Sequence, residues 1–186
     1  KKLLLLGAIT KIPLLIYIVI TLTTIPVIEA VEYKSILGAH RGDSITYIEN
    51  TLPAIESALE NEKYQFIEFD IQYTKDKKIV IFHDGTLLRM ELKTDSISNL
   101  TYEELTNKVS FSIPLYEDIL NIIGDSKRIN IEIKSSGNIE YDKELVDYVV
   151  SDATNRKILK NILISSISSY VIEYVSETYP EIKTGK

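Results

Sequence analysis

The hydrophobic pattern of this chain changes near residue 35. Before that point, nearly every position between residues 12 and 28 is apolar. After it, short apolar or alternating runs, typical of strands, alternate with segments whose apolar residues recur every three or four positions, typical of amphipathic helices. The pattern predicts strands at 36–39, 66–73, 79–82, 129–134 and 162–164, helices at 50–61, 112–124, 142–151 and 169–179, a short helix at 102–105, and a strand beginning at residue 182.

One connection is too short for a parallel crossover. Residues 74–78 join the second and third predicted strands, whereas a crossover between parallel strands needs about a dozen residues or more. We therefore expect a hairpin here, in which His83 returns opposite Asp70. Elsewhere the predicted strands alternate with helices, which indicates an α/β fold with a largely parallel sheet.

The apolar run near the start favours a membrane segment. Lysines precede the run and glutamates follow it, and its length is close to the roughly 20 residues that span a bilayer. We expect a membrane segment at 1–32, with a helix at about 12–30, and a globular domain at 35–186. The positive-inside rule then places that domain on the outer side of the cell membrane. A signal peptide cleaved after Ala30 and a buried core helix are the alternatives.

Composition narrows the range of partners. The formal net charge of −6 argues against a nucleic-acid partner, because binding to a phosphate backbone needs a basic face. The absence of cysteine rules out disulfides and thiolate metal sites. No protein partner is predicted. Because the chain begins with Lys1 and its single methionine is Met90, we expect further residues before it.

Carboxylates mark two of the predicted strands. Glu68 and Asp70 are two positions apart, so both point to the same face of their strand. Glu132 and Lys134 repeat this spacing on a later strand. Alternating acidic residues usually lie on the solvent-exposed face of a strand. Here helices are predicted to cover the sheet, so we expect these groups to gather instead at the C-terminal ends of the strands.

Each histidine follows an apolar run. His40 and Arg41 come directly after the strand at 36–39, and His83 comes directly after the strand at 79–82. Taken alone, a histidine after a strand is more often a structural group, and a single arginine is more often a surface charge. The repetition of polar groups at four strand ends favours a site.

The chemistry of these groups points to phosphodiester cleavage. Three oxygen ligands without a thiolate suit Ca²⁺ or Mg²⁺ better than zinc. Arginine and lysine suit the oxygens of a phosphate, and two imidazoles can act as base and acid on opposite sides of a phosphorus atom.

These residues, taken in order, resemble those of a known family, the glycerophosphodiester phosphodiesterases. The motifs are His40-Arg41-Gly42, Glu49-Asn50-Thr51, Glu68-x-Asp70, Thr74-Lys75-Asp76, His83-Asp84, Pro114-x-x-Glu117 and Glu132-x-Lys134. The resemblance implies a TIM-type (β/α)8 barrel of the PLC-like phosphodiesterase superfamily, which includes the bacterial phosphoinositide phospholipases. It also implies metal-dependent hydrolysis of glycerophosphodiesters to glycerol 3-phosphate and an alcohol, in lipid metabolism. With the upstream apolar run, the chain looks like a membrane-anchored bacterial member.

The resemblance carries roles to seven positions. It implies that three residues bind a divalent cation, that two form the acid–base pair and that two bind the substrate phosphate. The metal ligands are Glu68, Asp70 and Glu132, the acid–base pair is His40 and His83, and the phosphate contacts are Arg41 and Lys134.

The chain departs from the family pattern in its loops and in its length. Ile48 stands where the family usually has proline, and Met90 and Glu91 stand where it usually has threonines, which bears on substrate preference. The predicted strands number five and the start of a sixth, whereas the barrel has eight, so we expect a barrel truncated at the C-terminus. A phosphodiesterase that releases a cyclic phosphate and a membrane-tethered, non-catalytic binding module remain alternatives.

Overall fold

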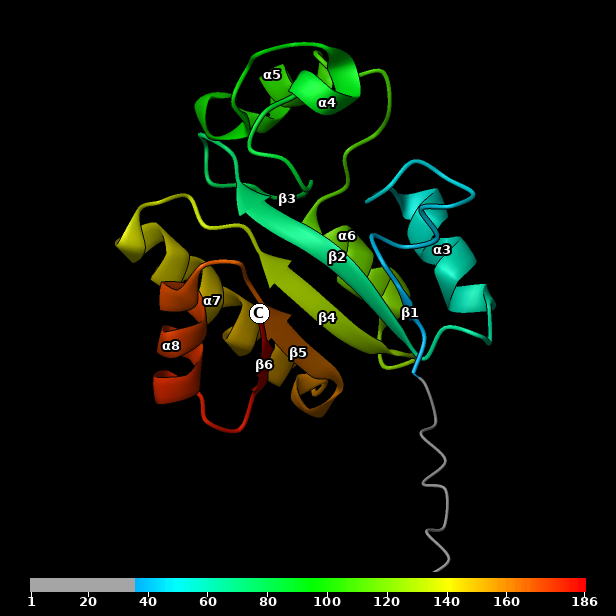
Figure 1. Ribbon diagram of the computed structural model, residues 1–186, viewed down its shortest axis with the longest axis vertical. Coiled ribbons are helices and arrows are strands. Elements are labelled where there is room, and N and C mark those ends of the chain that lie inside the picture. Colours follow the sequence, from blue (N-terminus) through cyan, green and yellow to red (C-terminus); the bar gives the residue numbers. More distant parts are fainter. Residues whose placement is uncertain (1–35) are drawn as a thin grey trace, which may run out of the picture. The chain divides into compact units, whose positions relative to one another are not determined.

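The computed structural model describes residues 36–186 (Figure 1). The elements, in order, are β1 (Gly38–Ala39), α3 (Leu52–Glu60), β2 (Phe66–Tyr73), β3 (Ile79–Ile81), α4 (Leu88–Glu91), η1 (Ile97–Asn99), α5 (Tyr102–Thr106), α6 (Tyr116–Ile123), β4 (Arg128–Ile133), α7 (Ile139–Asn155), η2 (Leu159–Asn161), β5 (Ile162–Ser165), α8 (Ser169–Thr178) and β6 (Lys183–Gly185).

The sheet is parallel apart from one hairpin strand. Its order is β1-β2-β4-β5-β6, and every neighbouring pair along this order is parallel. Helices connect successive parallel strands, as in the repeating unit of a TIM barrel. The predicted α/β fold with a parallel sheet is therefore confirmed as TIM-barrel-like.

The two faces of the sheet differ in character. Along β2 and β4, the isoleucines and the phenylalanine at odd positions are fully buried in one large core with apolar residues of α3, α6, α7 and α8. Figure 1 shows α3 and α6 beside the β1–β2 side of the sheet, and α7 and α8 beside β4 and β5. The even positions of β2 from Glu68 onward and those of β4 face the other way, toward what is the lumen of a TIM barrel, and there they carry charged or amide side chains.

The segment between β3 and α6 has a small core of its own. Seven buried apolar residues form a second cluster: Val80, Phe82, Leu87, Ile97, Leu100, Leu105 and Ile113. A capping box between Thr101 and Glu104 starts α5 within this segment. In Figure 1 the segment, in green, lies beyond the C-terminal end of β2. The sequence predicted only a short helix at 102–105 in this segment, because its apolar residues follow no regular period.

The hairpin is confirmed, but its register and its place in the sheet differ from expectation. Strand β3 pairs antiparallel with β2, and the ladder pairs Ile71 with Ile81. The Phe82 N–H donates to the Asp70 carbonyl at 3.1 Å, so Phe82, not His83, returns opposite Asp70. Strand β3 lies outside the parallel order and was wrongly counted toward the barrel: the described residues supply five parallel strands.

The predicted membrane segment at 1–32 lies outside the described residues. Within residues 36–186, none of the helices is long and apolar enough to cross a bilayer. The membrane helix and the C-terminal truncation therefore stay predictions.

Candidate active site

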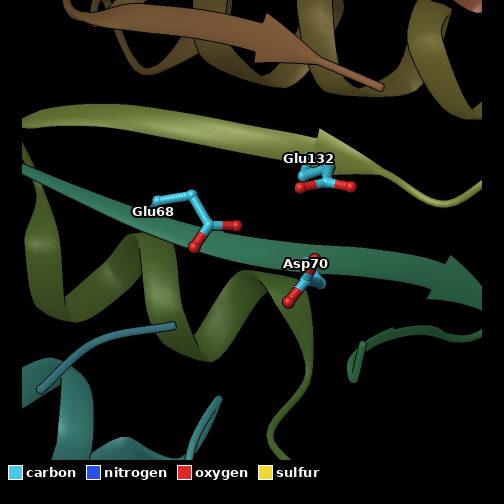
Figure 2. A group of neighbouring side chains, drawn as sticks. All are labelled: Glu68, Asp70 and Glu132. Atoms are coloured by element: carbon cyan, nitrogen blue, oxygen red, sulfur yellow. The ribbon is translucent and has the colours of Figure 1, made fainter. Parts of the chain in front are cut away.

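Three carboxylates gather near the C-terminal ends of β2 and β4. Glu68 and Asp70 project from the same face of β2, and Glu132 on β4 is the ladder partner of Asp70. Figure 2 shows the three side chains on one side of the sheet, turned toward one another. One ligand atom from each lies within 4.8 Å of the others. Glu68 and Asp70 are buried, at 4% and 0% exposure, so the solvent-facing alternative does not hold for them.

The cluster has the electrostatics of a cation site. Burial and the neighbouring charge of Asp70 raise the pKa of Glu68 to about 8, and Glu132 adds to the effect. Among the described residues, two buried carboxylate oxygens lack a hydrogen-bond partner, Oε1 of Glu68 and Oδ1 of Asp70. Buried polar atoms normally have hydrogen-bond partners. Carboxylate oxygens are the ligands that hard divalent cations such as Ca²⁺ and Mg²⁺ prefer. The residues present therefore fit a divalent metal ion.

Two cationic side chains flank the carboxylates. The Nζ atom of Lys134 lies 2.8 Å from Oδ1 of Asp70, as an ion pair without hydrogen-bonding geometry, and it also contacts Oε1 of Glu132. The Nε atom of Arg41 lies 3.6 Å from Oδ2 of Asp70. Both side chains are mostly buried, so their charges act in a medium of low polarity. They leave the cluster with a positive rim suited to an anion.

A tight turn after β1 brings His40 to the cluster. Arg41 and Gly42 both have positive φ, of 59° and 73°. This turn directs the Arg41 N–H to Oε2 of Glu68 at 2.7 Å and the Gly42 N–H to the Glu68 carbonyl at 3.1 Å. The Nε2 atom of His40 then lies 3.8 Å from Oε2 of Glu68, with a side chain that is 66% exposed. A Cβ on Gly42 would meet the Ala54 backbone at 2.7 Å, so this position needs glycine.

His83 is held beside β2, the strand that carries Glu68 and Asp70, through contacts of Gln72. The side-chain amide of Gln72, which shares a face with Asp70, donates to the carbonyls of Phe82 and Asp84, at 2.7 and 2.9 Å. His83 therefore lies between two anchored peptide groups. Its Nδ1 atom is 2.5 Å from Oδ1 of Asp84. A carboxylate at Nδ1 favours the tautomer with a proton there, which leaves Nε2 free to accept or give a proton.

The sequence missed the role of Asn50, which it placed at the start of a helix. Asn50 is buried, and its Nδ2 donates to Oδ2 of Asp70 at 2.7 Å while its Oδ1 accepts from the Asp70 N–H at 3.3 Å. Its φ of 58° lies in the left-handed region, and Thr51 takes the N-cap position of α3. The side chain thus orients a carboxylate of the cluster. The Glu49-Asn50-Thr51 motif marked the position without indicating the contact.

An ionic network beside the site was also missed. Glu49 accepts hydrogen bonds from Arg41 and from Arg89, and Arg89 in turn donates to Asp84. Burial opposes ionisation of Glu49, but the two arginines hold its pKa below the usual range. Burial likewise opposes ionisation of Asp84, and Arg89 with His83 holds the pKa of Asp84 low. Both carboxylates are therefore charged near neutral pH.

The structure brings the seven predicted site residues to one end of the parallel sheet. Direct contacts join six of them: His40, Arg41, Glu68, Asp70, Glu132 and Lys134. The seventh, His83, is tied to the same place through Gln72 and through the ionic network. In a TIM barrel, this end of the strands carries the active site.

Comparison with known proteins relates the chain to one family. Residues 40–186 match the model of the glycerophosphoryl diester phosphodiesterase family. A glycerophosphodiester phosphodiesterase from Caldanaerobacter subterraneus is 31% identical over 163 residues, and the match covers 82% of this chain and 66% of the relative.

Solved structures of related proteins share the fold. A glycerophosphodiester phosphodiesterase from Thermotoga maritima is 30% identical, with a TM-score of 0.67 over 81% of this chain and 61% of that one. A phosphodiesterase from Oleispira antarctica, solved with the product sn-glycerol 3-phosphate, is 23% identical, with a TM-score of 0.67 over 81% of this chain and 65% of that one. The chain thus spans just under two thirds of the length of these relatives.

Proposed function

Because this chain belongs to the glycerophosphoryl diester phosphodiesterase family, we propose that it hydrolyses glycerophosphodiesters to glycerol 3-phosphate and an alcohol, in lipid metabolism. The observation that carries the proposal is the meeting of three carboxylates, two imidazoles and two cationic side chains at one end of the sheet. The product seen in the Oleispira antarctica phosphodiesterase, sn-glycerol 3-phosphate, agrees with this substrate class.

The proposal assigns the metal to the carboxylate cluster. Glu68, Asp70 and Glu132 hold a divalent cation, Ca²⁺ or Mg²⁺, and the two buried carboxylate oxygens without a hydrogen-bond partner support this assignment. When bound, the cation neutralises a phosphoryl oxygen and stabilises the charge that develops on it. Asn50 keeps Asp70 in position by holding the carboxylate and the peptide N–H of that residue together.

The remaining side chains bind the phosphate and move protons. Arg41 and Lys134 bind the substrate phosphate and add positive charge where negative charge builds up. In the hydrolysis, a water oxygen bonds to phosphorus as the bond from phosphorus to the alcohol oxygen breaks. One imidazole of the His40–His83 pair takes the proton from water, and the other, protonated, gives its proton to the departing alkoxide.

Asp84 prepares His83 for this role. By accepting a hydrogen bond from the Nδ1–H of His83, Asp84 leaves Nε2 as the reacting atom and stabilises the imidazolium when it forms. His40 instead lies 3.8 Å from the Glu68 carboxylate, and its side chain is largely exposed to solvent.

We extend the proposal to a membrane-anchored protein of bacterial type, with the domain at 35–186 on the outer side of the cell membrane. Its support is the apolar run between residues 12 and 28, with lysines before it and glutamates after it. Fractionation of cells that make the full-length protein, followed by protease treatment of intact cells, tests this. Protein recovered in the soluble fraction, or protected from protease in intact cells, contradicts it.

The test of the activity is turnover of glycerophosphocholine and glycerophosphoethanolamine by the full-length protein, with the products identified by phosphorus NMR. We expect glycerol 3-phosphate, loss of turnover with chelator, and recovery with Ca²⁺ or Mg²⁺. His40→Ala and His83→Ala should each lower kcat by about 100- to 10,000-fold. Glu140→Gln, a change at an exposed residue of α7, is the control.

Three outcomes contradict the proposal in different parts. A cyclic phosphate product would show that the reaction is of the lyase type and not a hydrolysis. Turnover that is insensitive to chelator would contradict the proposed role of the metal ion. Near-normal kcat in either histidine variant removes that histidine from the acid–base pair.

A further inference from the structure

Arg89 connects the two loops that carry the histidines. It lies in α4, and its guanidinium group faces a carboxylate from each loop. On the side of His40, its Nη1 and Nη2 atoms donate to the two carboxylate oxygens of Glu49, at 3.0 and 2.5 Å. On the side of His83, its Nε atom donates to Oδ2 of Asp84 at 2.6 Å.

This geometry is that of a rigid clamp. Two parallel N–H groups on one carboxylate form the bidentate arrangement that fixes both direction and distance, and the third N–H lies in the same plane. Among the described residues, the Arg89–Glu49 pair makes all the side-chain hydrogen bonds between the loop at 40–50 and the segment at 83–91. The relative position of the two loops therefore depends on this pair.

The clamp reaches the imidazole of His83 through Asp84. One oxygen of Asp84 accepts from Arg89, and the other lies 2.5 Å from Nδ1 of His83. With Oδ2 fixed, the carboxylate plane of Asp84 is fixed, and so is the direction of its contact with the ring. At the other end, Glu49 also accepts from Nη1 of Arg41 at 3.0 Å, so the same carboxylate orients a proposed phosphate contact.

We propose that Arg89 is a positioning residue, which sets the orientation and tautomer of His83 relative to the His40 loop through Asp84 and Glu49 without contacting the substrate. The kinetic part of this inference rests on the proposed function. Its structural part does not, because the state of the His83 ring can be measured without turnover.

The kinetic test is Arg89→Gln in the full-length protein. The variant should lower kcat by about 10- to 100-fold, the size typical of a residue that orients a functional imidazole from outside the site, with little change in KM. Asp84→Asn should have a similar effect, and the double variant should be no worse than the more impaired single variant, because both changes break one path. An arginine that bound the substrate directly would instead raise KM.

The spectroscopic test uses the ring nitrogens. The sequence holds two histidines, so 15N-labelled histidine gives two sets of ring signals, and His40→Ala assigns them. In the unaltered protein at a pH where the ring is neutral, His83 should show a protonated Nδ1. In Arg89→Gln, the His83 signals should shift toward a mixture of tautomers, while the His40 signals stay in place.

Arg156→Gln is the matched control. Arg156 also donates to a carboxylate and an amide, Asp152 and Asn121, each at 2.8 Å, but it lies at the C-cap of α7, the end of the helix away from the site. This variant should change neither kcat nor the His83 signals. If Arg89→Gln does not fold, as judged by circular dichroism, Arg89→Lys takes its place in both tests. Lysine retains the positive charge but cannot make the bidentate contact with Glu49.

Two results would overturn the inference. One is an unchanged tautomer of His83 in a folded Arg89 variant, whatever its activity. The other is a raised KM with unchanged kcat, which would make Arg89 a substrate contact. Absence of turnover in the unaltered protein, with the predicted tautomer and its shift in the variant, would count against the proposed function and leave the positioning role standing.

Discussion

Replacing Glu68 with glutamine should remove most of the pH dependence of stability of the metal-free protein near neutral pH. Burial raises the pKa of Glu68 from its ordinary 4.5 to about 8, and Asp70 and Glu132 add to the shift. A carboxyl group with a raised pKa binds its proton more tightly in the folded state than in the unfolded state. Its contribution to stability is therefore complete below pH 4.5 and is lost as the pH rises toward 8.

The size of the effect follows from the shift. Each pKa unit corresponds to about 1.4 kcal/mol, so a shift from 4.5 to about 8 sets an upper limit of about 5 kcal/mol on the stability lost between these pH values. Glu68 has only 6% of its side chain exposed, so screening by solvent removes little of this. Glutamine has nearly the same shape and no proton to lose, so Glu68→Gln should hold its stability constant over the same range.

The assay is urea unfolding at a series of pH values between 5.5 and 8.5, with chelator present. Twelve tyrosines and no tryptophan make tyrosine fluorescence and far-UV circular dichroism the suitable probes. Saturating Ca²⁺ or Mg²⁺ should flatten the pH dependence of the unaltered protein, because the cation keeps Glu68 ionised in the folded state. Glu140→Gln, at a highly exposed position, should leave the slope unchanged. Equal slopes in the unaltered protein and in Glu68→Gln would refute the reasoning.

Two further substitutions test how the site is supported. Asn50→Ala leaves buried groups of Asp70 without their hydrogen bonds, so it should lower the free energy of unfolding, measured with urea, by about 1–3 kcal/mol. It should also weaken cation binding, measured by calorimetry, by about 10- to 100-fold. Unchanged cation affinity would contradict the role of Asn50. Gly42→Ala combines a positive φ of 73° with a Cβ 2.7 Å from the Ala54 backbone, so it should reduce stability by more than the roughly 1–2 kcal/mol of left-handed strain alone. Gly137→Ala, with a φ of 77° and open space around its Cβ, is the comparison in thermal melts, and equal losses in both variants would rule out the clash.

The elements could be predicted because local pattern decides them. Strand β2 reads as alternating positions in the sequence, and its bounds agree with the prediction at 66–73. The five-residue link after it could only be a hairpin, and β3 is antiparallel to β2. Glu68 and Asp70 share a face by the same period of two. The grouping of carboxylates on one side of the sheet therefore follows from positions that lie close together in the chain.

The sequence could not indicate contacts that depend on backbone detail. Asn50 precedes a helix that has proline in its first turn, so a helix cap is the simplest interpretation, yet its left-handed φ turns the side chain toward Asp70. The helix predicted at 142–151 begins earlier, at Ile139, because Asn138 caps it. The Asp142 carboxylate, inside the helix, accepts hydrogen bonds from the hydroxyl groups of Ser135 and Ser136 in the loop after β4.

Glu68 shows why the loop and the carboxylate cluster depend on each other. Its Oε2 atom accepts the Arg41 N–H and so fixes the turn that carries His40, while its Oε1 atom is buried and unpaired beside Asp70. Without a cation, burial favours the neutral acid, whose bond to the Arg41 N–H is weaker than that of a carboxylate. A bound cation restores the carboxylate and strengthens the contact with the turn. Occupation of the metal site and the placement of His40 are therefore linked through one side chain.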